Sequence, residues 1–505
     1  MPIFELSRII DECSSLDNIN IKLMKEDAPE CKKMHSDHKL PLFEYQKEGV
    51  EFGLNHDKWL LLDAPGLGKT YQSICIAEEL KERENIEHCL IICGVNALKA
   101  NWQKEIEKSS KYDSIIIGRK VNKNGTISYT SIDKRAEQLK EKIDQFFVIV
   151  NVESLRDKKV IDAILKGKNK FDLIIFDEIH NVKSPKSQQS KGLLKLKAKY
   201  QIGLTGTLII NNPLDAYMPL RWIEEETASF SVFKVTYCVM DDYWHTNVVG
   251  YKNVDFLRDQ INLCSLRRTK NILSLPSKTI IPEFLEMKDD QRKFYQDLQA
   301  GITEKVDKVF LVTEHLLGMV TRLRQAVVCP SILSTEKISS VKVDRAAELI
   351  GDILSQGEKV VVFSNFKQPL EELKEKIKQG VICTGDITDD QIAENINNFQ
   401  TDENSKVLLC TLAKMSTGVT LTAATYMIFL DTPWTYALFE QACDRIYRIG
   451  TEKKVTIYNL ICENTIDERV YALINQKKDI SDYMSGQELS DNERLRFLLN
   501  LPVYK

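Results

Sequence analysis

The sequence of 505 residues is poor in the features that mark several common classes of protein. No stretch approaches the roughly 20 consecutive apolar residues that cross a bilayer, so we expect no membrane span. It contains no internal repeat and no low-complexity tract, which argues against a solenoid or a linker protein. Neither sign of charge dominates, because 69 basic and 73 acidic residues leave a net charge of −4. Any nucleic-acid binding must therefore come from local basic patches.

Paired metal-binding cysteines are also missing. The twelve cysteines are scattered without a Cys-x-x-Cys, and a chain of this length needs no disulfides, so we expect reduced, buried thiols. Cys31, His35 and His38 lie close together in sequence, with Cys13 as the only other candidate ligand nearby. Structural zinc is closed by four ligands, so we predict no zinc site. The first residues lack a basic start and a cleavage site, so we predict no signal peptide and a cytoplasmic protein, or a nuclear one if eukaryotic.

Short apolar runs separated by helical stretches predict an α/β fold with two parallel-sheet lobes. Strands buried on both faces of a parallel sheet consist almost entirely of Val, Ile, Leu and Phe. Such runs form two clusters, at Leu90–Cys93, Phe147–Val150 and Leu173–Phe176, and at Lys359–Phe363, Val407–Cys410 and Met427–Leu430. Between the clusters the apolar spacing is helical. The predicted organisation is an N-terminal extension (1–39), a first lobe (40–224), a helical region (225–335), a second lobe (336–480) and a tail (481–505).

A glycine-containing turn follows the first predicted strand, Leu60–Leu62. The turn leads into Lys69, Thr70 and a helix. Glycines let backbone N–H groups approach phosphates, and the N-terminus of a helix favours anions. In this pattern Lys69 reaches the β and γ phosphates and the Thr70 hydroxyl binds Mg²⁺. We predict an ATP-binding loop formed by Asp63, Ala64, Pro65, Gly66, Leu67, Gly68, Lys69 and Thr70, in which Asp63 stands where the general pattern has glycine.

An acidic pair ends the apolar strand Leu173–Phe176. In a lobe that holds a phosphate loop, a carboxylate at the end of a strand suits Mg²⁺. We predict Asp177 as the Mg²⁺ ligand and Glu178 as the general base that orients and deprotonates the attacking water. His180, two residues further on, is predicted to signal between ATP and neighbouring segments.

The order of these motifs resembles that of the Swi/Snf-type DNA-translocating ATPases of helicase superfamily 2. The resemblance extends from about Leu40 to Lys478, and the family's phosphate loop also begins with an acidic residue. In the first lobe the matching segments are LPLFEYQ (40–46), DAPGLGKT (63–70), CLIICGVNALKANW (89–102), DEIH (177–180) and LTGTLIINNP (204–213). Segments typical of this family are LRRTKNILSLPSKT (266–279), EMKDDQRKFYQDL (286–298) and LRQAVVCPSIL (323–333). In the second lobe KVVVFSNF, KVLLCTLAKMSTGVTLTAA and FLDTPWTYALFEQACDRIYRIG follow in the expected order.

The resemblance implies two RecA-like lobes that share one ATP site. It implies that Gln46 reads the adenine base. Arg445 and Arg448, one turn apart in a segment expected to be helical, are predicted to face the γ-phosphate from the second lobe and to be catalytic with Lys69, Asp177 and Glu178. Residues implied in coupling ATP state to DNA grip are His180, Thr205, Thr207, Gly418 and Gln441. Candidate nucleic-acid contacts are Lys183, Lys186, Arg267, Arg268 and Trp102.

The implied function is an ATP-driven motor that moves along double-stranded or branched DNA, as a compact monomer of bacterial or phage type. Two other interpretations stay open. One is a superfamily 2 helicase acting on single-stranded DNA or RNA, and the other is a nucleic-acid-binding scaffold within a larger complex. The presence of every predicted catalytic residue argues against a silent scaffold, and a transporter ATPase or small-molecule kinase needs no second lobe with its own arginines.

Overall fold

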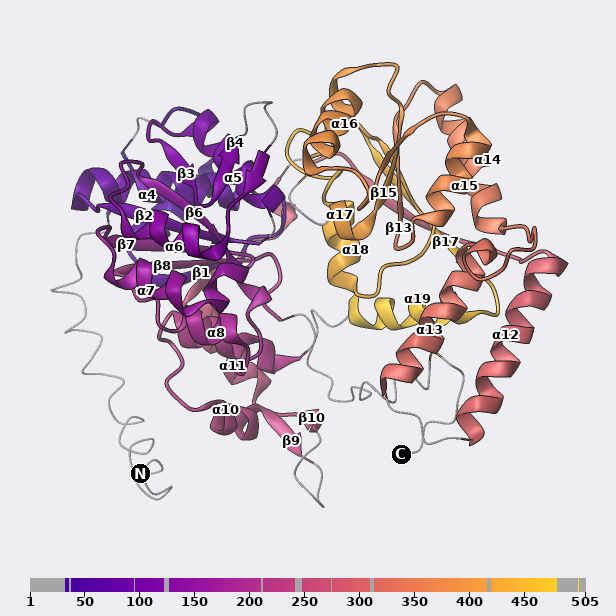
Figure 1. The fold of residues 1–505 in the computed structure, drawn as a ribbon, viewed down its shortest axis with the longest axis horizontal. Helices are drawn as coiled ribbons and strands as arrows, with labels where there is room; N and C mark the ends of the chain where they lie inside the picture. Colours follow the sequence, from indigo (N-terminus) through magenta and orange to yellow (C-terminus); the bar gives the residue numbers. More distant parts are fainter. Residues whose placement is uncertain are drawn as a thin grey trace.

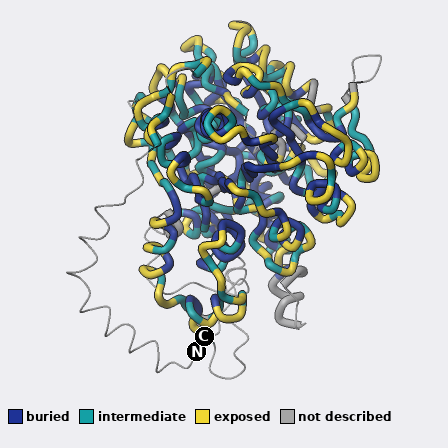
Figure 2. Tube along the Cα trace, turned by 90° about the vertical axis from the view of Figure 1, so that its left-hand side faces the viewer, coloured by how far each residue is buried: buried dark blue, intermediate teal, exposed yellow. Residues whose placement is uncertain are grey.

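The computed structural model shows two lobes side by side, joined by segments that cross between them (Figure 1). It describes residues 32–35, 38–94, 96–121, 127–209, 212–240, 248–273, 275–308, 313–415, 419–478 and 498. Within these ranges no helix is long and apolar enough to cross a membrane. Buried segments gather in the interior of the molecule, and exposed ones lie mainly at its periphery (Figure 2).

The first lobe is built on a parallel sheet of seven strands. In spatial order these are β11 (Ser265–Leu266), β1 (Lys58–Leu61), β8 (Tyr200–Leu204), β7 (Phe171–Asp177), β2 (His88–Cys93), β6 (Phe147–Asn151) and β3 (Ser114–Ile116). A separate antiparallel hairpin joins β4 (Arg119–Val121) to β5 (Ile127–Tyr129). All six residues of β2 are buried, as expected for a strand covered on both faces.

Helices cover both faces of this sheet. Alternate residues of each strand point to opposite faces, so Leu90 and Ile92 join one core while Cys89 and Ile91 join the other. The second core is covered by α3 (Glu44–Leu54), α4 (Lys69–Glu84) and α5 (Asn96–Ser109). The first is covered by α6 (Ile132–Lys140), α7 (Lys158–Lys166), α8 (Gln188–Leu193), α9 (Tyr217–Trp222), α10 (Phe230–Tyr237) and α11 (Val254–Leu263).

The second lobe has a parallel sheet of six strands. Their order is β12 (Lys278–Leu285), β17 (Val455–Cys462), β16 (Tyr426–Phe429), β13 (Val360–Ser364), β15 (Val407–Thr411) and β14 (Val381–Cys383). Its helices are α14 (Val341–Ser355), α15 (Gln368–Ile377), α16 (Asp389–Thr401), α17 (Leu412–Met415), α18 (Tyr436–Cys443) and α19 (Ile466–Lys478). Short 3-10 turns occur along the whole chain and are η1 (Val152–Arg156), η2 (Ile179–Asn181), η3 (Pro213–Ala216), η4 (Lys270–Ile272) and η5 (Pro330–Ile332).

The segment 225–335 contributes to both lobes. Its helices α10 and α11 pack on the first lobe, while α12 (Asp289–Lys308) and α13 (Thr313–Val328) share a core with α19. Strands also form in this segment, which was predicted to be helical: β11 ends the first sheet, β12 begins the second, and β9 (Cys238–Met240) pairs with β10 (Val248–Tyr251). The exact domain boundaries stay a prediction.

The ten cysteines among the described residues are free and buried, which confirms that part of the prediction, whereas Cys13 and Cys31 lie outside the described ranges. In the described part of the chain no group of three or more metal-ligating side chains is arranged to hold a metal ion. His38 instead lies between two carboxylates of α4. Its Nδ1 is 3.2 Å from Glu78 Oε2 and its Nε2 is 3.2 Å from Glu79 Oε1. His38 therefore fastens the residues before α3 to the helix that follows the phosphate loop.

The His38 contact should make stability depend on pH. Its contacts with Cys75, Glu78 and Glu79 raise the pKa of His38 to about 11. A raised histidine pKa stabilises the folded state fully below the unfolded pKa of about 6.5, and the stabilisation is lost as pH rises toward the folded value. We expect the thermal midpoint of the wild-type chain to fall between pH 6.5 and 9 relative to His38→Gln, by the equivalent of about 1 kcal/mol per pH unit. Parallel melting curves for the two proteins across this range would contradict the contact.

Candidate ATP-hydrolysis site

The predicted phosphate loop connects β1 to α4 in a conformation that needs glycine. Gly66 has φ +87° and Gly68 has φ +78°, values that other residues adopt at a cost. Gly68 caps α4 without a side-chain hydrogen bond, so the first N–H groups of the helix are left for a ligand. The Lys69 amine donates to the carbonyl of Asp63 at 2.7 Å. The loop thus presents N–H groups and a lysine together, as phosphate binding requires, and Thr70 follows in the first turn of α4.

Asp63 is completely buried, and an arginine from a distant part of the sequence neutralises it. Arg268 donates from Nε to Asp63 Oδ1 at 2.9 Å and from Nη2 to Asp63 Oδ2 at 2.6 Å. Gln72, in the first turn of α4, donates to Asp63 Oδ2 at 3.1 Å and accepts from Arg268 Nη2 at 2.7 Å. Gln72 was not predicted as a site residue, although its place one turn after Lys69 puts it on the side of α4 that faces the loop.

The start of α3 packs against the same loop. Gln46, which was predicted to read the adenine, is 4% exposed and donates to the carbonyl of Leu67 at 3.2 Å. The hydroxyl of Tyr45 donates to the same carbonyl at 3.2 Å. Gln46 also accepts the backbone N–H of Phe43 at 3.1 Å, which fixes the first turn of the helix. Gln46 is therefore next to the nucleotide loop, and its contact with adenine remains a prediction.

The acidic pair lies at the end of β7, beside the phosphate loop. Trp102 donates from Nε1 to Asp177 Oδ2 at 2.8 Å. Burial and the adjacent charge of Glu178 raise the pKa of Asp177 to about 6. Burial alone would raise the pKa of Glu178 as well, but the nearby His180 imidazole, 3.2 Å from Glu178 Oε2, and the charge of Lys69 bring it below its usual value. The two neighbouring carboxylates are thus separated in acidity by their surroundings, the pKa of Asp177 being raised and that of Glu178 lowered.

The predicted coupling residues of the first lobe form a continuous chain of contacts. His180 Nδ1 is 3.2 Å from Glu178 Oε2 and 2.8 Å from Thr205 Oγ1. The Thr205 hydroxyl donates to the carbonyl of Thr207 at 3.0 Å, so it accepts from His180. At the next residue, a Cβ on Gly206 would lie 2.7 Å from Pro65 Cδ. The loop after β8 therefore contacts the phosphate loop directly and reaches Glu178 through His180.

Both predicted arginines of the second lobe face this site. Arg448 packs so closely that a Cβ on Gly66 would lie 2.9 Å from its Cβ. Burial and the neighbouring Arg448 lower the pKa of Arg445 to about 10, while the charge of Glu178 opposes the shift. The predicted helix is wrong here, because α18 ends at Cys443 and the arginines lie in the turns that follow. The backbone N–H of Arg445 bonds to the carbonyl of Ala442, three residues back, which ends the helical ladder.

The buried lysine of the phosphate loop is balanced by acids from several motifs. Burial lowers the pKa of Lys69, and the charges of Glu178, Asp177 and Asp63 oppose that change. The charge of Asp444, in the second lobe, also raises the pKa of Lys69. The positive and negative groups of both lobes thus lie within electrostatic range of one another at one site.

Two of the residues predicted to contact nucleic acid are held inside the first lobe, beside the phosphate loop and the acidic pair. Trp102 is 2% exposed and Arg268 is held by Asp63, so neither side chain is available to a polymer in this conformation. Lys183 is partly buried, 4.0 Å from Asp215. Lys186 and Arg267 are exposed. Further lysines follow Lys186 in the sequence, and Lys191, Lys195, Lys197 and Lys199 are also exposed.

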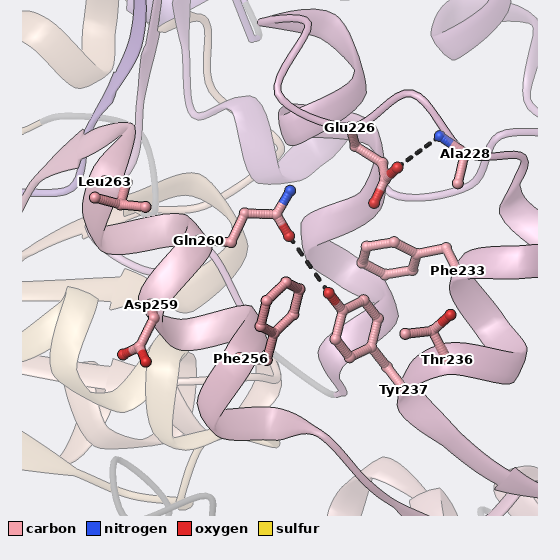
Figure 3. Close-up of a pocket in the computed structure, with 9 residues that line it drawn as sticks. All are labelled: Glu226, Ala228, Phe233, Thr236, Tyr237, Phe256, Asp259, Gln260 and Leu263. Atoms are coloured by element: carbon pink, nitrogen blue, oxygen red, sulfur yellow. Dashed lines mark hydrogen bonds between the residues drawn. The ribbon is translucent and has the colours of Figure 1, made fainter. Parts of the chain in front are cut away.

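Two further predicted positions carry less information. Gly418 lies outside the described residues. Gln441 lies on α18, in the last turn before the arginine-bearing turns. A cavity of about 420 Å³ between α10 and α11 is lined by Phe233, Tyr237, Phe256 and their neighbours (Figure 3). The predicted site residues do not line this cavity, so it is separate from the ATP site.

Two parallel-sheet lobes that meet at one phosphate loop define the class of two-lobed P-loop ATPases. The model of the SNF2-related domain matches residues 45–332, and the model of the helicase conserved C-terminal domain matches residues 342–450. The first match alone covers more than half of the chain, so the chain belongs to the SNF2-related family. It contains the core of an ATP-dependent helicase and is a nucleic-acid-dependent ATPase by class.

Relatives are found in bacteria and in animals. An uncharacterized ATP-dependent helicase of Mycoplasma pneumoniae is 27% identical over 98% of this chain and 48% of its own length. A putative ATP-dependent helicase/translocase of Bacillus subtilis is 26% identical over 92% of this chain and 50% of its own. The DNA annealing helicase and endonuclease ZRANB3 of Bos taurus is 27% identical over 90% of this chain and 42% of its own length. The chain therefore spans about half the length of the curated relatives it matches.

Among solved structures, the Sulfolobus solfataricus SWI2/SNF2 ATPase core in complex with dsDNA aligns with a TM-score of 0.42 and 23% identity. The alignment covers 94% of this chain and 100% of that one.

Replacing Gly49, a buried residue of α3, should disturb the site. A Cβ at Gly49 would lie 1.9 Å from Gln72 Oε1 and 2.7 Å from Arg268 Nη2. Alanine in a helix normally gains about 1 kcal/mol over glycine. We expect Gly49→Ala instead to lower the free energy of unfolding by about 1–3 kcal/mol, because the crowded side chains must move. ATP binding, measured by titration calorimetry, should weaken as well.

Gly351→Ala is the matched control for this substitution. Gly351 is an exposed residue of α14, and a Cβ added there would meet no atom of the described residues within 4 Å. This change should leave ATP binding unaltered and raise stability by up to about 1 kcal/mol. Equal effects of the two substitutions on ATP binding would show that Gly49 has no special role.

Proposed function

We propose that this chain couples ATP hydrolysis to movement along double-stranded or branched DNA, and so remodels protein–DNA complexes or branched structures. The observation that carries the proposal is the approach of Arg445 and Arg448 to the phosphate loop and to Glu178 of the other lobe. A site completed by both lobes hydrolyses ATP only while they are together. Turnover then alternates closed and open arrangements, and this alternation moves a two-lobed protein along a polymer.

The residues present suit ATP with a divalent cation. Thr70 and Asp177 supply the hydroxyl and carboxylate oxygens that Mg²⁺ prefers, and they would hold the ion beside the phosphates. The bound ion would neutralise charge on the phosphate oxygens. Lys69 and the N–H groups at the start of α4 would bind the phosphates. Glu178 would orient the attacking water and accept its proton, and the arginines would stabilise the charge that develops on the γ-phosphoryl group.

His180 connects the residues that would carry out hydrolysis to a loop that would affect nucleic-acid binding. It contacts the general base on one side and the loop 205–207 on the other. A change at Glu178 on hydrolysis would therefore alter the position of that loop. We propose that His180, Thr205 and Thr207 transmit the change toward the nucleic acid.

The proposed polymer-binding surface consists of basic side chains gripping phosphates. Lys186, Lys191, Lys195 and Arg267 are exposed on the first lobe and the linker that leaves it. Phosphate contacts of this kind provide affinity without sequence preference. Duplex DNA as the substrate is favoured by the relatives, among which one is named a helicase/translocase and another a DNA annealing helicase. We propose that the core acts as a monomer.

The polymer is identified by measuring ATP turnover with no nucleic acid, duplex DNA, forked DNA, single-stranded DNA and RNA. We expect duplex or forked DNA to stimulate turnover most, and the stimulation to fall steeply between two salt concentrations because phosphate contacts dominate. Glu178→Gln provides the blank, since it removes the general base while preserving the fold. Stimulation by RNA but not by duplex DNA would overturn the assignment to DNA. An ATPase indifferent to all four polymers would remove the motor function altogether.

Arg445→Ala should retain ATP binding and lose hydrolysis. The guanidinium belongs to the second lobe, whereas the phosphate loop that binds ATP belongs to the first. Loss of an arginine that stabilises the transition state lowers kcat by about 10³-fold or more. Arg322→Ala, an exposed arginine of α13, is the matched control and should keep both properties. An Arg445→Ala protein with wild-type kcat would exclude this arginine from the reaction.

A further inference from the structure

The linker between the two sheets passes directly through the ATP site. It leaves the first lobe after β11 and enters the second at β12. At its beginning it extends beside the phosphate loop: the N–H of Leu62 donates to the carbonyl of Leu266 at 2.8 Å, and the N–H of Ala64 donates to the carbonyl of Arg268 at 2.9 Å. The linker is thus a physical continuation of the sheet edge next to the nucleotide.

Arg268 attaches the linker to the first lobe. Its guanidinium binds both carboxylate oxygens of Asp63 and the amide oxygen of Gln72, and it also donates to the carbonyl of Tyr45. A bidentate pair between a planar guanidinium and a carboxylate fixes orientation as well as distance. The start of the linker is therefore held rigidly against the phosphate loop.

Lys270, two residues later, attaches the linker to the second lobe. Its amine forms an ion pair with Asp444 and donates to the carbonyl of Tyr447. The amine also lies 5.0 Å from the centre of the Tyr447 ring. Asp444 immediately precedes Arg445, and Tyr447 immediately precedes Arg448. One amine thus binds both turns that carry the arginines.

The spacing of these attachments limits how far the two halves of the site separate. Two residues of extended chain span at most about 7 Å. While Arg268 binds Asp63 and Lys270 binds Asp444, the arginine-bearing turns are therefore kept close to the phosphate loop. The side chains of Lys270 and Asp444 are only 16% and 5% exposed, so separating this pair leaves an unpaired charge in a buried position unless water enters.

We propose that Lys270 is a positioning residue for hydrolysis, which holds Arg445 and Arg448 against the phosphate loop that Arg268 fixes from the other side. The proposal rests on the proposed ATPase function of the same site. Both partners of Lys270 belong to the second lobe, next to the arginines and not to the phosphate loop that binds ATP. Its loss should impair hydrolysis while sparing the binding of ATP by the first lobe.

The test compares Lys270→Met, Lys270→Arg, Asp444→Asn and the control Thr269→Ala. Methionine keeps the length of the side chain and removes its charge, and Thr269 is an exposed residue between the two attachment points. Nucleotide affinity is measured by titration with a fluorescent ATP analogue, and kcat with KM by steady-state hydrolysis on the polymer that stimulates the wild-type protein most. Thermal midpoints confirm that each variant folds.

We expect Lys270→Met and Asp444→Asn to lower kcat by about 10- to 100-fold, the effect of misplacing a reacting group. Nucleotide affinity should change by less than about threefold, because the first lobe binds the nucleotide and Lys270 positions residues of the second lobe. Lys270→Arg should recover much of the rate, and Thr269→Ala should behave as wild type. If Lys270→Met fails to fold, the kcat of Asp444→Asn tests the positioning role, because this variant removes the other charge of the same ion pair.

The possible failures are distinguishable. Wild-type kcat in Lys270→Met or Asp444→Asn would overturn the positioning role and leave the ATPase function intact. Parallel loss of affinity and rate without recovery by Lys270→Arg would also overturn it, as this pattern indicates a general structural defect. A wild-type chain that hydrolyses no ATP with any polymer would overturn the proposed function, and this proposal with it.

Discussion

The buried carboxylate of Asp63 is the interaction on which the ATP site depends. A completely buried charge is costly unless it is paired and hydrogen-bonded, and here Arg268 and Gln72 satisfy both oxygens. This requirement draws together α3, α4 and the interlobe linker. It also explains why α3 carries Gly49, since any larger residue would meet Gln72 and Arg268. An acidic residue at the first position of the loop therefore joins the phosphate loop to the linker.

From that point the site extends in two directions. Toward the strand ends of the first lobe, His180 and Thr205 connect Glu178 to the loop beside Pro65. Toward the second lobe, the linker passes from Arg268 to Lys270, which binds the turns around the arginines. Along the second route each buried carboxylate is paired with a cation, Asp63 with Arg268 and Asp444 with Lys270, so each of these groups depends on its partner for ionisation. A site arranged in this way responds as a unit to a change in any one charge.

The strands of both lobes were predictable where they are long and continuously apolar. The runs near Leu90, Val148, Ile174, Val361, Leu408 and Ile428 are all strands of the two sheets. Strands β3, β8, β11, β12, β14 and β17 were missed. In β8 and β12 residues such as Gln201 and Pro282 interrupt the apolar pattern. β11 has only two residues and is a strand through its pairing with β1. Such a segment has no sequence signal of its own, because its hydrogen-bond partner is distant in the chain.

The sequence by itself determined the phosphate loop, the acidic pair, the loop at Thr205 and Thr207, and the segment with Arg445 and Arg448. Each of these motifs relies on local chemistry at a fixed spacing. Only the tertiary structure showed that Arg268 binds Asp63 and that Trp102 donates to Asp177. Both types of side chain occur at nucleic-acid surfaces and in buried networks alike, and burial distinguishes the two. The contact of Lys270 with Asp444 joins residues far apart in the chain, so its physical origin lies in the packing of two lobes and not in any local pattern.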